Sequence, residues 1–312
     1  CPGCYRGLAE ENPKRIHEDL KKIKSDIDKL IESRNIQTLS IAGGEPLLYP
    51  KIKEVIEYAS FKGIKTKVFT NGVLLTKSKL IDLKNIRVTE FVVHIDKYQK
   101  RPDMKDLKNT NELRERFCKL FREVGNVNLG FIMPVSGEDY SDLSDAIEIC
   151  KKNSDVVNLL VLSPYKDVLL NKDKTFNKTK LQNPDISKLS DYLSSNFESK
   201  PCAFLGKINS KEQPSWIFMV PVFYGEKIIG YLDSFLYKKF QERYREKKGK
   251  YFITINGNKI NTKSLLPLIF NKNASKILWN LRKEKNKNKD KIYDLRYQVI
   301  LIIDGPDNVN GE

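Results

Sequence analysis

Apolar residues return along this chain with two different periods, and the two periods alternate. Between residues 16 and 31 they recur every three or four positions, as they do on one face of an amphipathic helix. Asn12 and Pro13 precede this stretch, in positions that suit a helix cap and a first helical turn. A short, mostly apolar run at residues 38–42 then predicts a strand directly after the helix.

The same alternation continues through the first half of the chain. The expected strands cover residues 38–42, 65–69, 90–95, 127–133 and 156–162, and the helices expected between them cover residues 52–61, 113–124 and 143–151. Strands separated by helices of this length pair in parallel through right-handed crossovers. The pattern therefore predicts an α/β fold, in which ligands gather at the carboxyl ends of the strands.

The rhythm changes after Pro164. Two strands at 216–220 and 227–232 are expected to meet through Gly225 and Glu226. The other expected elements are helices near 186–196 and 265–281 and strands at 251–255 and 297–303. We therefore expect three parts: a β/α domain over residues 1–165, a linker with a helix over 166–200, and an α+β C-terminal domain of unknown role over 201–312.

Composition narrows the choice of partners. The chain has 312 residues, 40% of them hydrophobic, and no apolar run approaches the roughly 20 residues that span a bilayer. Its net charge of +16 raises nucleic acid and an anionic membrane surface as partners. However, Lys outnumbers Arg, and runs such as residues 238–243 mix both signs, as solvated helix faces do. Nucleic acid is therefore not expected, and an anionic membrane has only weak support.

The five cysteines fall into two groups. Cys118, Cys150 and Cys202 stand in apolar surroundings and are expected to be buried bystanders. The odd total predicts a reducing, cytoplasmic location rather than a disulfide framework. Cys1 and Cys4 form a CxxC pair, which by itself fits a zinc site, an iron–sulfur cluster or a redox dithiol.

Two further motifs favour one of these readings. A strand-like run ends in Gly43-Gly44-Glu45-Pro46, and the next expected strand ends in Thr70-Asn71-Gly72. Together with the CxxC pair, these motifs resemble the radical S-adenosylmethionine (radical SAM) superfamily, whose signature is CxxxCxxC followed by a strand that ends in a GGEP-type sequence. The resemblance spans residues 1–165. Its first cysteine would stand four residues before Cys1, so we expect the printed sequence to begin inside the motif and only the complete protein to bind a cluster.

The resemblance implies a fold, cofactors and ligands. The fold is a partial (β/α)6 barrel, counting one strand before Cys1, and the cofactors are a 4Fe-4S cluster and S-adenosylmethionine. Cys1 and Cys4 would bind the cluster, Tyr5 would pack by the adenine, and the run from Gly43 to Pro46 would bind the methionine amino group. A reductant such as flavodoxin or ferredoxin would supply the electron that cleaves S-adenosylmethionine to a 5'-deoxyadenosyl radical, which abstracts hydrogen from an unknown lipid or peptide substrate.

Polar residues at the other strand ends complete the candidate site. His94 and Asp96 share one face of a strand because strand side chains alternate, and by the resemblance they are candidates for the ribose hydroxyls. Gln99 and Arg101 follow on the same loop and are candidates for substrate contact. By the resemblance Thr70 and Asn71 would also bind the cofactor, and by similar logic the nucleoside would be lined by Asn128, Gly130 and residues 162–164.

Two other functions remain open at this point. Cys1-Pro2-Gly3-Cys4 also suits a thiol oxidoreductase, although a thioredoxin-like fold is too short to explain the repeated β/α units and the Gly-Gly-Glu-Pro run. A non-catalytic barrel that presents a basic surface is the third reading. Cluster binding by the complete protein distinguishes the first reading from the other two.

Overall fold

A computed structural model describes residues 17–97, 99, 101–103, 110–137, 140–164, 184–207, 210–249, 258–287 and 292–304. Cys1, Cys4, Tyr5, the expected cap at residues 12–13 and the expected strand at 251–255 lie outside these residues. Within them, eight strands form one sheet in the order β1-β2-β3-β4-β5-β11-β7-β6. They are β1 (Thr38–Ile41), β2 (Lys65–Thr70), β3 (Val88–His94), β4 (Asn128–Val135), β5 (Val157–Pro164), β6 (Pro201–Lys207), β7 (Ser210–Met219) and β11 (Val299–Ile303).

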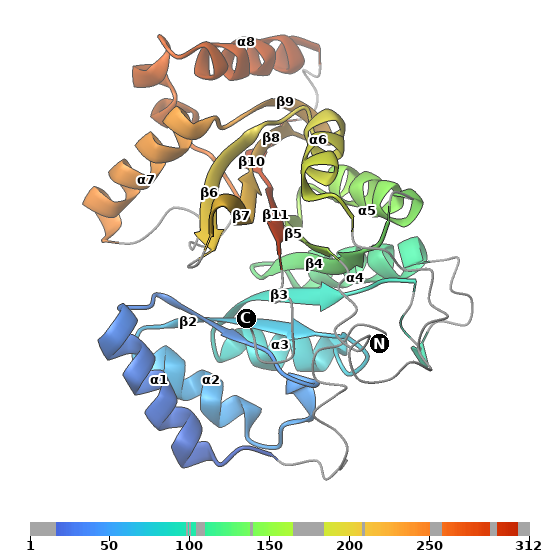
Figure 1. Cartoon of the computed structure of the whole chain (residues 1–312), viewed down its shortest axis with the longest axis vertical. Helices are drawn as coiled ribbons and strands as arrows, with labels where there is room; N and C mark the ends of the chain where they lie inside the picture. The colour runs from blue at the N-terminus through green and yellow to red at the C-terminus, as the bar shows by residue number, and fades with distance from the viewer. Residues whose placement is uncertain are drawn as a thin grey trace.

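Strands β1 to β5 and β11 run parallel, whereas β7 and β6 close the sheet antiparallel (Figure 1). The five strands expected in the first half of the chain are confirmed to within two residues at each end. The predicted α/β class and the mostly parallel sheet are therefore correct. In such a sheet the carboxyl ends of the parallel strands meet at one edge, and the candidate residues Glu45, Thr70, Asn71, His94 and Asp96 lie there.

Helices cover one face of this sheet. They are α1 (Leu20–Arg34), α2 (Ile52–Phe61), α3 (Lys77–Asn85), α4 (Thr110–Val124), α5 (Ser141–Lys152) and α6 (Ile186–Asn196). The apolar side chains of α2 to α6 share one core with alternate strand residues such as Phe91 and Phe131, and the largest helical members are Phe117 and Phe121, whereas α1 packs against α2. The helix α3 was not predicted, because only Leu80 and Leu83 of its nine residues are buried.

The C-terminal elements pack against the other face. They are β8 (Pro221–Tyr224), β9 (Lys227–Tyr231), α7 (Ser234–Lys248), two 3-10 turns at Thr262–Ser264 and Leu266–Leu268, α8 (Lys272–Lys287) and β10 (Leu295–Tyr297). Strands β10, β8 and β9 form a small antiparallel sheet. Val92 and Val161 of the large sheet belong to one core with Leu236 and Phe240 of α7. Figure 1 shows α7 and α8 at the opposite end of the molecule from α1 and α2.

Three details of the C-terminal region differ from the prediction. The expected turn at Gly225 and Glu226 is present, but it joins β8 to β9, because residues 216–219 belong to β7 and pair with β11. The expected helix at 265–281 begins only at Lys272. The expected strand at 297–303 is split between β10 and β11, and β11 lies parallel to β5 as the sixth parallel strand of the large sheet.

The helix expected at 186–196 is confirmed as α6.

Candidate functional site

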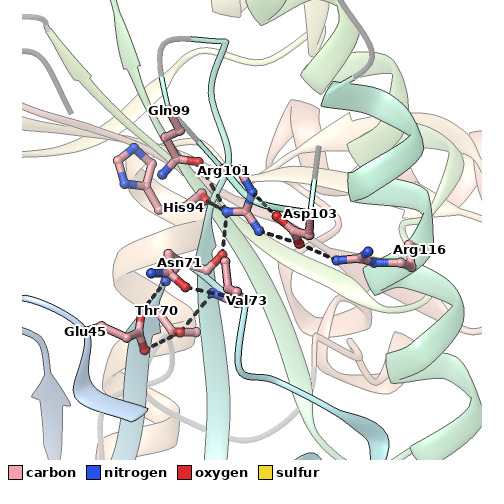
Figure 2. A network of polar contacts seen from close by, with 10 residues as sticks. Glu45, Thr70, Asn71, Val73, His94, Gln99, Arg101, Asp103 and Arg116 are labelled. Carbon is pink, nitrogen blue, oxygen red and sulfur yellow. Dashed lines mark hydrogen bonds and ion pairs between the residues drawn. The ribbon is translucent and has the colours of Figure 1, made fainter. Parts of the chain in front are cut away.

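The Glu45 carboxylate connects the carboxyl ends of β1 and β2. Its Oε1 atom accepts hydrogen bonds from the Leu47 amide at 3.0 Å and the Thr70 hydroxyl at 2.7 Å. Its Oε2 atom accepts one from the Asn71 amide at 2.8 Å, and Figure 2 shows the bonds from Thr70 and Asn71. The first of these bonds caps the 3-10 turn Pro46–Leu48. Three donors therefore fix this carboxylate at the edge of the sheet where parallel strands end.

The two glycines before Glu45 leave open space beside their main chain. Gly43 has a φ of 153°, a conformation that side chains with a Cβ rarely adopt. An ideal Cβ at Gly44 would meet nothing within 4 Å, and both glycines are exposed. A ligand can therefore approach the backbone here without a side chain in the way.

The segment from Thr70 to Val73 turns tightly after β2. The Thr70 hydroxyl accepts from the Gly72 amide at 2.9 Å, and the Asn71 Oδ1 atom accepts from the Val73 amide at 2.9 Å. Gly72 has a φ of 75°, and an added Cβ would lie 2.6 Å from a ring carbon of Phe117. The glycine is therefore required here both by the backbone conformation and by the packing of α4 against the turn.

His94 and Asp96 lie together at the end of β3, as predicted from strand alternation. His94 Nε2 is 2.8 Å from Asp96 Oδ2, with the His94 side chain 33% exposed and the Asp96 side chain 1% exposed. This contact pairs the imidazole with a buried carboxylate at the carboxyl end of β3.

Arg101 lies between the turn after β2 and the end of β3, and it donates hydrogen bonds to both. Its Nε and Nη2 atoms both donate to Asp103 at 3.0 Å, and its Nη1 atom donates to the main-chain oxygens of Asn71 at 2.5 Å and His94 at 3.1 Å. Nη1 also reaches Gln99 Oε1 at 3.3 Å. All three nitrogens of this buried guanidinium thus donate within the protein, whereas the sequence assigned Arg101 and Gln99 to substrate contact.

Three charged residues of this region were not singled out from the sequence. Asp103 accepts from Arg116 at 2.7 Å in addition to its two bonds from Arg101. The fully buried Arg114 donates to the Ile95 main-chain oxygen at 3.2 Å, next to the carbonyl that Arg101 binds. The burial of Arg114 could have been predicted from the sequence, since it lies on the apolar face of its helix with Phe117 and Phe121.

Asn128 and Gly130 were expected to line the nucleoside, but the structure gives them other surroundings. Asn128 is the first residue of β4, at the amino edge of the sheet, where it lines a cavity of about 700 Å³ together with Lys65 and Arg87. The expectation for Asn128 is therefore wrong. A Cβ at Gly130 would lie 3.0 Å from the Leu159 Cβ, so close strand packing accounts for this glycine. Ser163 is half-buried near the carboxyl end of β5.

The three scattered cysteines are buried, as predicted. Burial raises the pKa of Cys150 and of Cys202 to about 12 and raises that of Cys118 as well, so these thiols stay protonated at neutral pH. Among the described residues, no group of three or more His, Cys, Asp or Glu side chains could hold a metal ion. The described helices also include none that is long and apolar enough to cross a membrane.

Comparison with known proteins supports the resemblance seen in the motifs. Residues 1–150 match the family model of the radical SAM superfamily. The chain is 30% identical over 142 residues to 7-carboxy-7-deazaguanine synthase of Methanocaldococcus jannaschii, a match that covers 45% of this chain and 55% of that protein. It is 31% identical over 88 residues to the subtilosin biosynthesis protein AlbA of Bacillus subtilis, covering 28% of this chain and 19% of AlbA.

Solved structures resemble the chain more distantly. Streptococcus suis SuiB bound to its precursor peptide SuiA matches with a TM-score of 0.46 and 17% identity, over 64% of this chain and 43% of SuiB. Archaeal TYW1 matches with a TM-score of 0.34 and 17% identity, over 62% of this chain and 71% of TYW1. The chain thus spans about half the length of the methanogen relative and smaller shares of AlbA and SuiB.

Proposed function

Residues 1–150 of this chain belong to the radical SAM superfamily, and on that premise we propose that the complete protein cleaves S-adenosylmethionine reductively. Members of this superfamily are enzymes that use a 4Fe-4S cluster and S-adenosylmethionine. The observation that carries the proposal is the Glu45 carboxylate, fixed by Thr70 and Asn71 beside the exposed glycines 43 and 44. This arrangement stands at the sheet edge where ligands of parallel sheets bind.

In the proposal, Cys1 and Cys4 supply two thiolate ligands of the cluster, and Tyr5 packs by the adenine. All three lie outside the described residues, so their assignment rests on the motif. The described cysteines are buried and protonated, which leaves the CxxC pair as the available thiolates of this chain. When bound, the reduced cluster supplies the electron that breaks a carbon–sulfur bond of S-adenosylmethionine, and the resulting radical removes hydrogen from substrate.

The segment from Gly43 to Pro46 would recognise the methionine ammonium group. The Glu45 carboxylate already accepts three hydrogen bonds from the protein, and the carbonyls of Glu45 and Pro46 accept from Leu48 and Tyr49, so direct contact with the ammonium would fall mainly to the main chain of the exposed glycines 43 and 44. The carboxylate holds that main chain in place and adds a nearby negative charge. Asn71 contributes through its amide bond to Glu45 rather than through its side chain, which caps its own turn.

His94 and Asp96 would hold the ribose. A ribose hydroxyl can donate to a carboxylate and accept from an imidazole N–H, and the two side chains offer both groups within 2.8 Å of each other. His94 is partly exposed and Asp96 is buried beside it, so a ligand that enters from the carboxyl edge would meet His94 first, and Asp96 would hold the imidazole in place. Buried Val92 and half-buried Ile132, from the same face of the sheet, provide apolar surface beside this pair.

The proposed reaction also needs an electron donor and a substrate. A reductant such as flavodoxin or ferredoxin would donate the electron. A peptide substrate is supported by the relative that acts in bacteriocin biosynthesis, and a lipid by the exposed apolar residues Leu205 and Trp216 of the β6–β7 hairpin. The boundaries of the three proposed parts, 1–165, 166–200 and 201–312, and the cytoplasmic location remain predictions.

Cluster binding tests the proposal. The complete gene product, reconstituted anaerobically with iron and sulfide, is expected to bind four irons per chain and to lose them in the Cys4→Ala variant. Cys150→Ala is the matched control, since it removes a buried thiol that stands far from the motif in the sequence. Equal iron loss from both variants, or a complete gene that encodes no cysteine four residues before Cys1, would contradict the assignment.

A further inference from the structure

We propose that Arg101 is the positioning residue of the S-adenosylmethionine site, because its guanidinium joins the strand ends that carry the methionine-binding and ribose-binding groups. This inference rests on the proposed function and deepens it. Arg101 need not touch the ligand. It acts through two main-chain carbonyls, those of Asn71 after β2 and His94 at the end of β3 (Figure 2).

The first link runs from Arg101 to Glu45 through a single residue. Asn71 offers its carbonyl oxygen to Arg101 and its amide hydrogen to the Glu45 carboxylate, at 2.5 Å and 2.8 Å. The two bonds lie on either side of the same α-carbon, so Arg101 restrains the main chain of the residue whose amide holds Glu45. The Asn71 side-chain oxygen does not replace the main-chain carbonyl as an acceptor for Arg101, since it accepts from the Val73 amide.

The second link runs to the ribose-binding pair. Arg101 donates to the His94 carbonyl, and Arg114 donates to the next carbonyl, that of Ile95, at 3.1 Å and 3.2 Å. The main chain between His94 and Asp96 is thus held by two buried guanidinium groups in succession. This restraint helps to keep the buried Asp96 carboxylate 2.8 Å from His94 Nε2.

The third link anchors Arg101 itself. Asp103 receives two parallel bonds from Arg101 and one from Arg116 on α4. A bidentate arginine–carboxylate pair fixes the plane of the guanidinium, which a lysine ammonium cannot do. The plane is what allows Nη1 to face both carbonyls at once. Arg101 therefore connects the helix α4 to the ends of β2 and β3.

The chain contains a matched control at the other edge of the sheet. Arg122, near the end of α4, makes the same type of bidentate pair with Asp155, at 2.7 Å for both bonds, and also donates to Asn153. These partners precede β5 and lie far from Glu45 in the chain. Arg122→Lys thus disrupts a second bidentate arginine–carboxylate pair at the amino edge of the sheet, away from the candidate site, although both of its side chains are nearly half exposed whereas Arg101 is buried.

The test compares Arg101→Lys with Arg122→Lys in the complete, cluster-loaded protein. We expect Arg101→Lys to keep the iron content and to raise the dissociation constant of S-adenosylmethionine about tenfold or more in titration calorimetry, whereas Arg122→Lys leaves it unchanged. Amide hydrogen exchange supplies a readout that needs no ligand. Exchange of the Asn71 amide should accelerate about tenfold in Arg101→Lys and stay unchanged in Arg122→Lys.

Each outcome decides one point. Wild-type protein that carries a cluster but binds no S-adenosylmethionine would overturn the proposed function and this inference with it. Wild-type binding that Arg101→Lys leaves unchanged would overturn the inference alone, as would unaltered exchange of the Asn71 amide. If Arg101→Lys does not fold, Asp103→Asn takes its place, because it keeps Arg101 but removes its anchor and should shift both readouts in the same direction.

Discussion

The Asp103 carboxylate accepts hydrogen bonds from two arginines beside the candidate site, so its ionisation should make the stability of the fold depend on pH. Burial by itself raises the pKa of the Asp103 carboxyl group, but the hydrogen bonds from Arg101 and Arg116 outweigh burial and hold the pKa below its usual range. A lowered pKa in the folded state stabilises the fold above the pKa of the unfolded chain, about 3.9. That stability is lost as the pH falls through the folded pKa.

We therefore predict that Asp103→Asn lowers the free energy of unfolding at pH 7 by about 1–3 kcal/mol, because two guanidinium groups lose a charged acceptor. The difference from wild type should shrink as the pH falls below about 4. Urea denaturation at several pH values measures both effects. Asp145→Asn on the exposed face of α5 is the control, and a wild-type advantage that grows in acid would contradict the sign of the shift.

The buried thiols give a second prediction for single residues. The thiolate is the reactive form of cysteine, and burial raises the pKa of Cys150 and Cys202 to about 12. We expect iodoacetamide at pH 8 to leave Cys118, Cys150 and Cys202 unmodified in the native protein and to modify all three after denaturation. Mass spectrometry of peptides reads the result. Rapid native labelling of Cys150 would show that the region around α5 opens, contrary to the structure.

Among the short elements, the turn after β2 is the most constrained, and two glycines of equal conformation allow its packing to be measured. Gly72 and Gly63 have φ values of 75° and 76°, but only at Gly72 does an added Cβ meet other atoms, 2.6 Å from Phe117 and 2.9 Å from Val93. The conformational cost of alanine, about 1–2 kcal/mol, is shared by both sites. The steric cost belongs to Gly72 alone.

We predict that Gly63→Ala destabilises the protein by about 1–2 kcal/mol and Gly72→Ala by about 2–5 kcal/mol, the excess being the cost of overpacking. Chemical denaturation of both variants gives the difference directly. Since Gly72 follows Asn71, Gly72→Ala should also weaken binding of S-adenosylmethionine. Equal destabilisation at the two positions would mean that α4 does not pack on this turn as described.

Helices and strands could be predicted from the sequence where the spacing of apolar residues was regular and strands alternated with helices along the chain. The parallel strands β1 to β5 follow from apolar runs spaced by helices, and their polar end residues Glu45, Thr70 and Asn71 meet because parallel strands end at one edge. Arg101 could not be assigned in this way. A polar residue on a loop gives the same sequence signal whether it faces a ligand or the carbonyls of its own chain.

On the scale of the whole molecule, β11 connects the two halves of the chain. It inserts between β5 and β7, parallel to the first and antiparallel to the second. Gln298, just before it, is buried and donates to the carbonyls of Cys150 and Val157 at 2.6 Å and 3.0 Å. The sequence predicted a strand here but not its place, because an isolated apolar run does not indicate which strand it pairs with.

This arrangement predicts that the β/α half does not fold alone. A protein that ends at Pro164 lacks β11 and the elements that cover Leu159 and Val161 on the second face, so apolar surface and an unpaired edge of β5 are exposed. We expect it to aggregate or to bind a hydrophobic dye, whereas the chain through Asp304 unfolds in one cooperative transition. A monomeric, cooperatively folding 1–164 protein would instead support the proposed domain boundary at residue 165.

The most direct test of the proposed function is product analysis. The complete gene product, reconstituted with iron and sulfide and reduced under anaerobic conditions, is incubated with S-adenosylmethionine, quenched and separated by chromatography. We predict slow formation of 5'-deoxyadenosine and methionine in equal amounts, even without substrate, and no formation in the Cys4→Ala variant. S-Adenosylhomocysteine as the sole product, or no nucleoside product from a protein with an intact cluster, would contradict reductive cleavage by this protein.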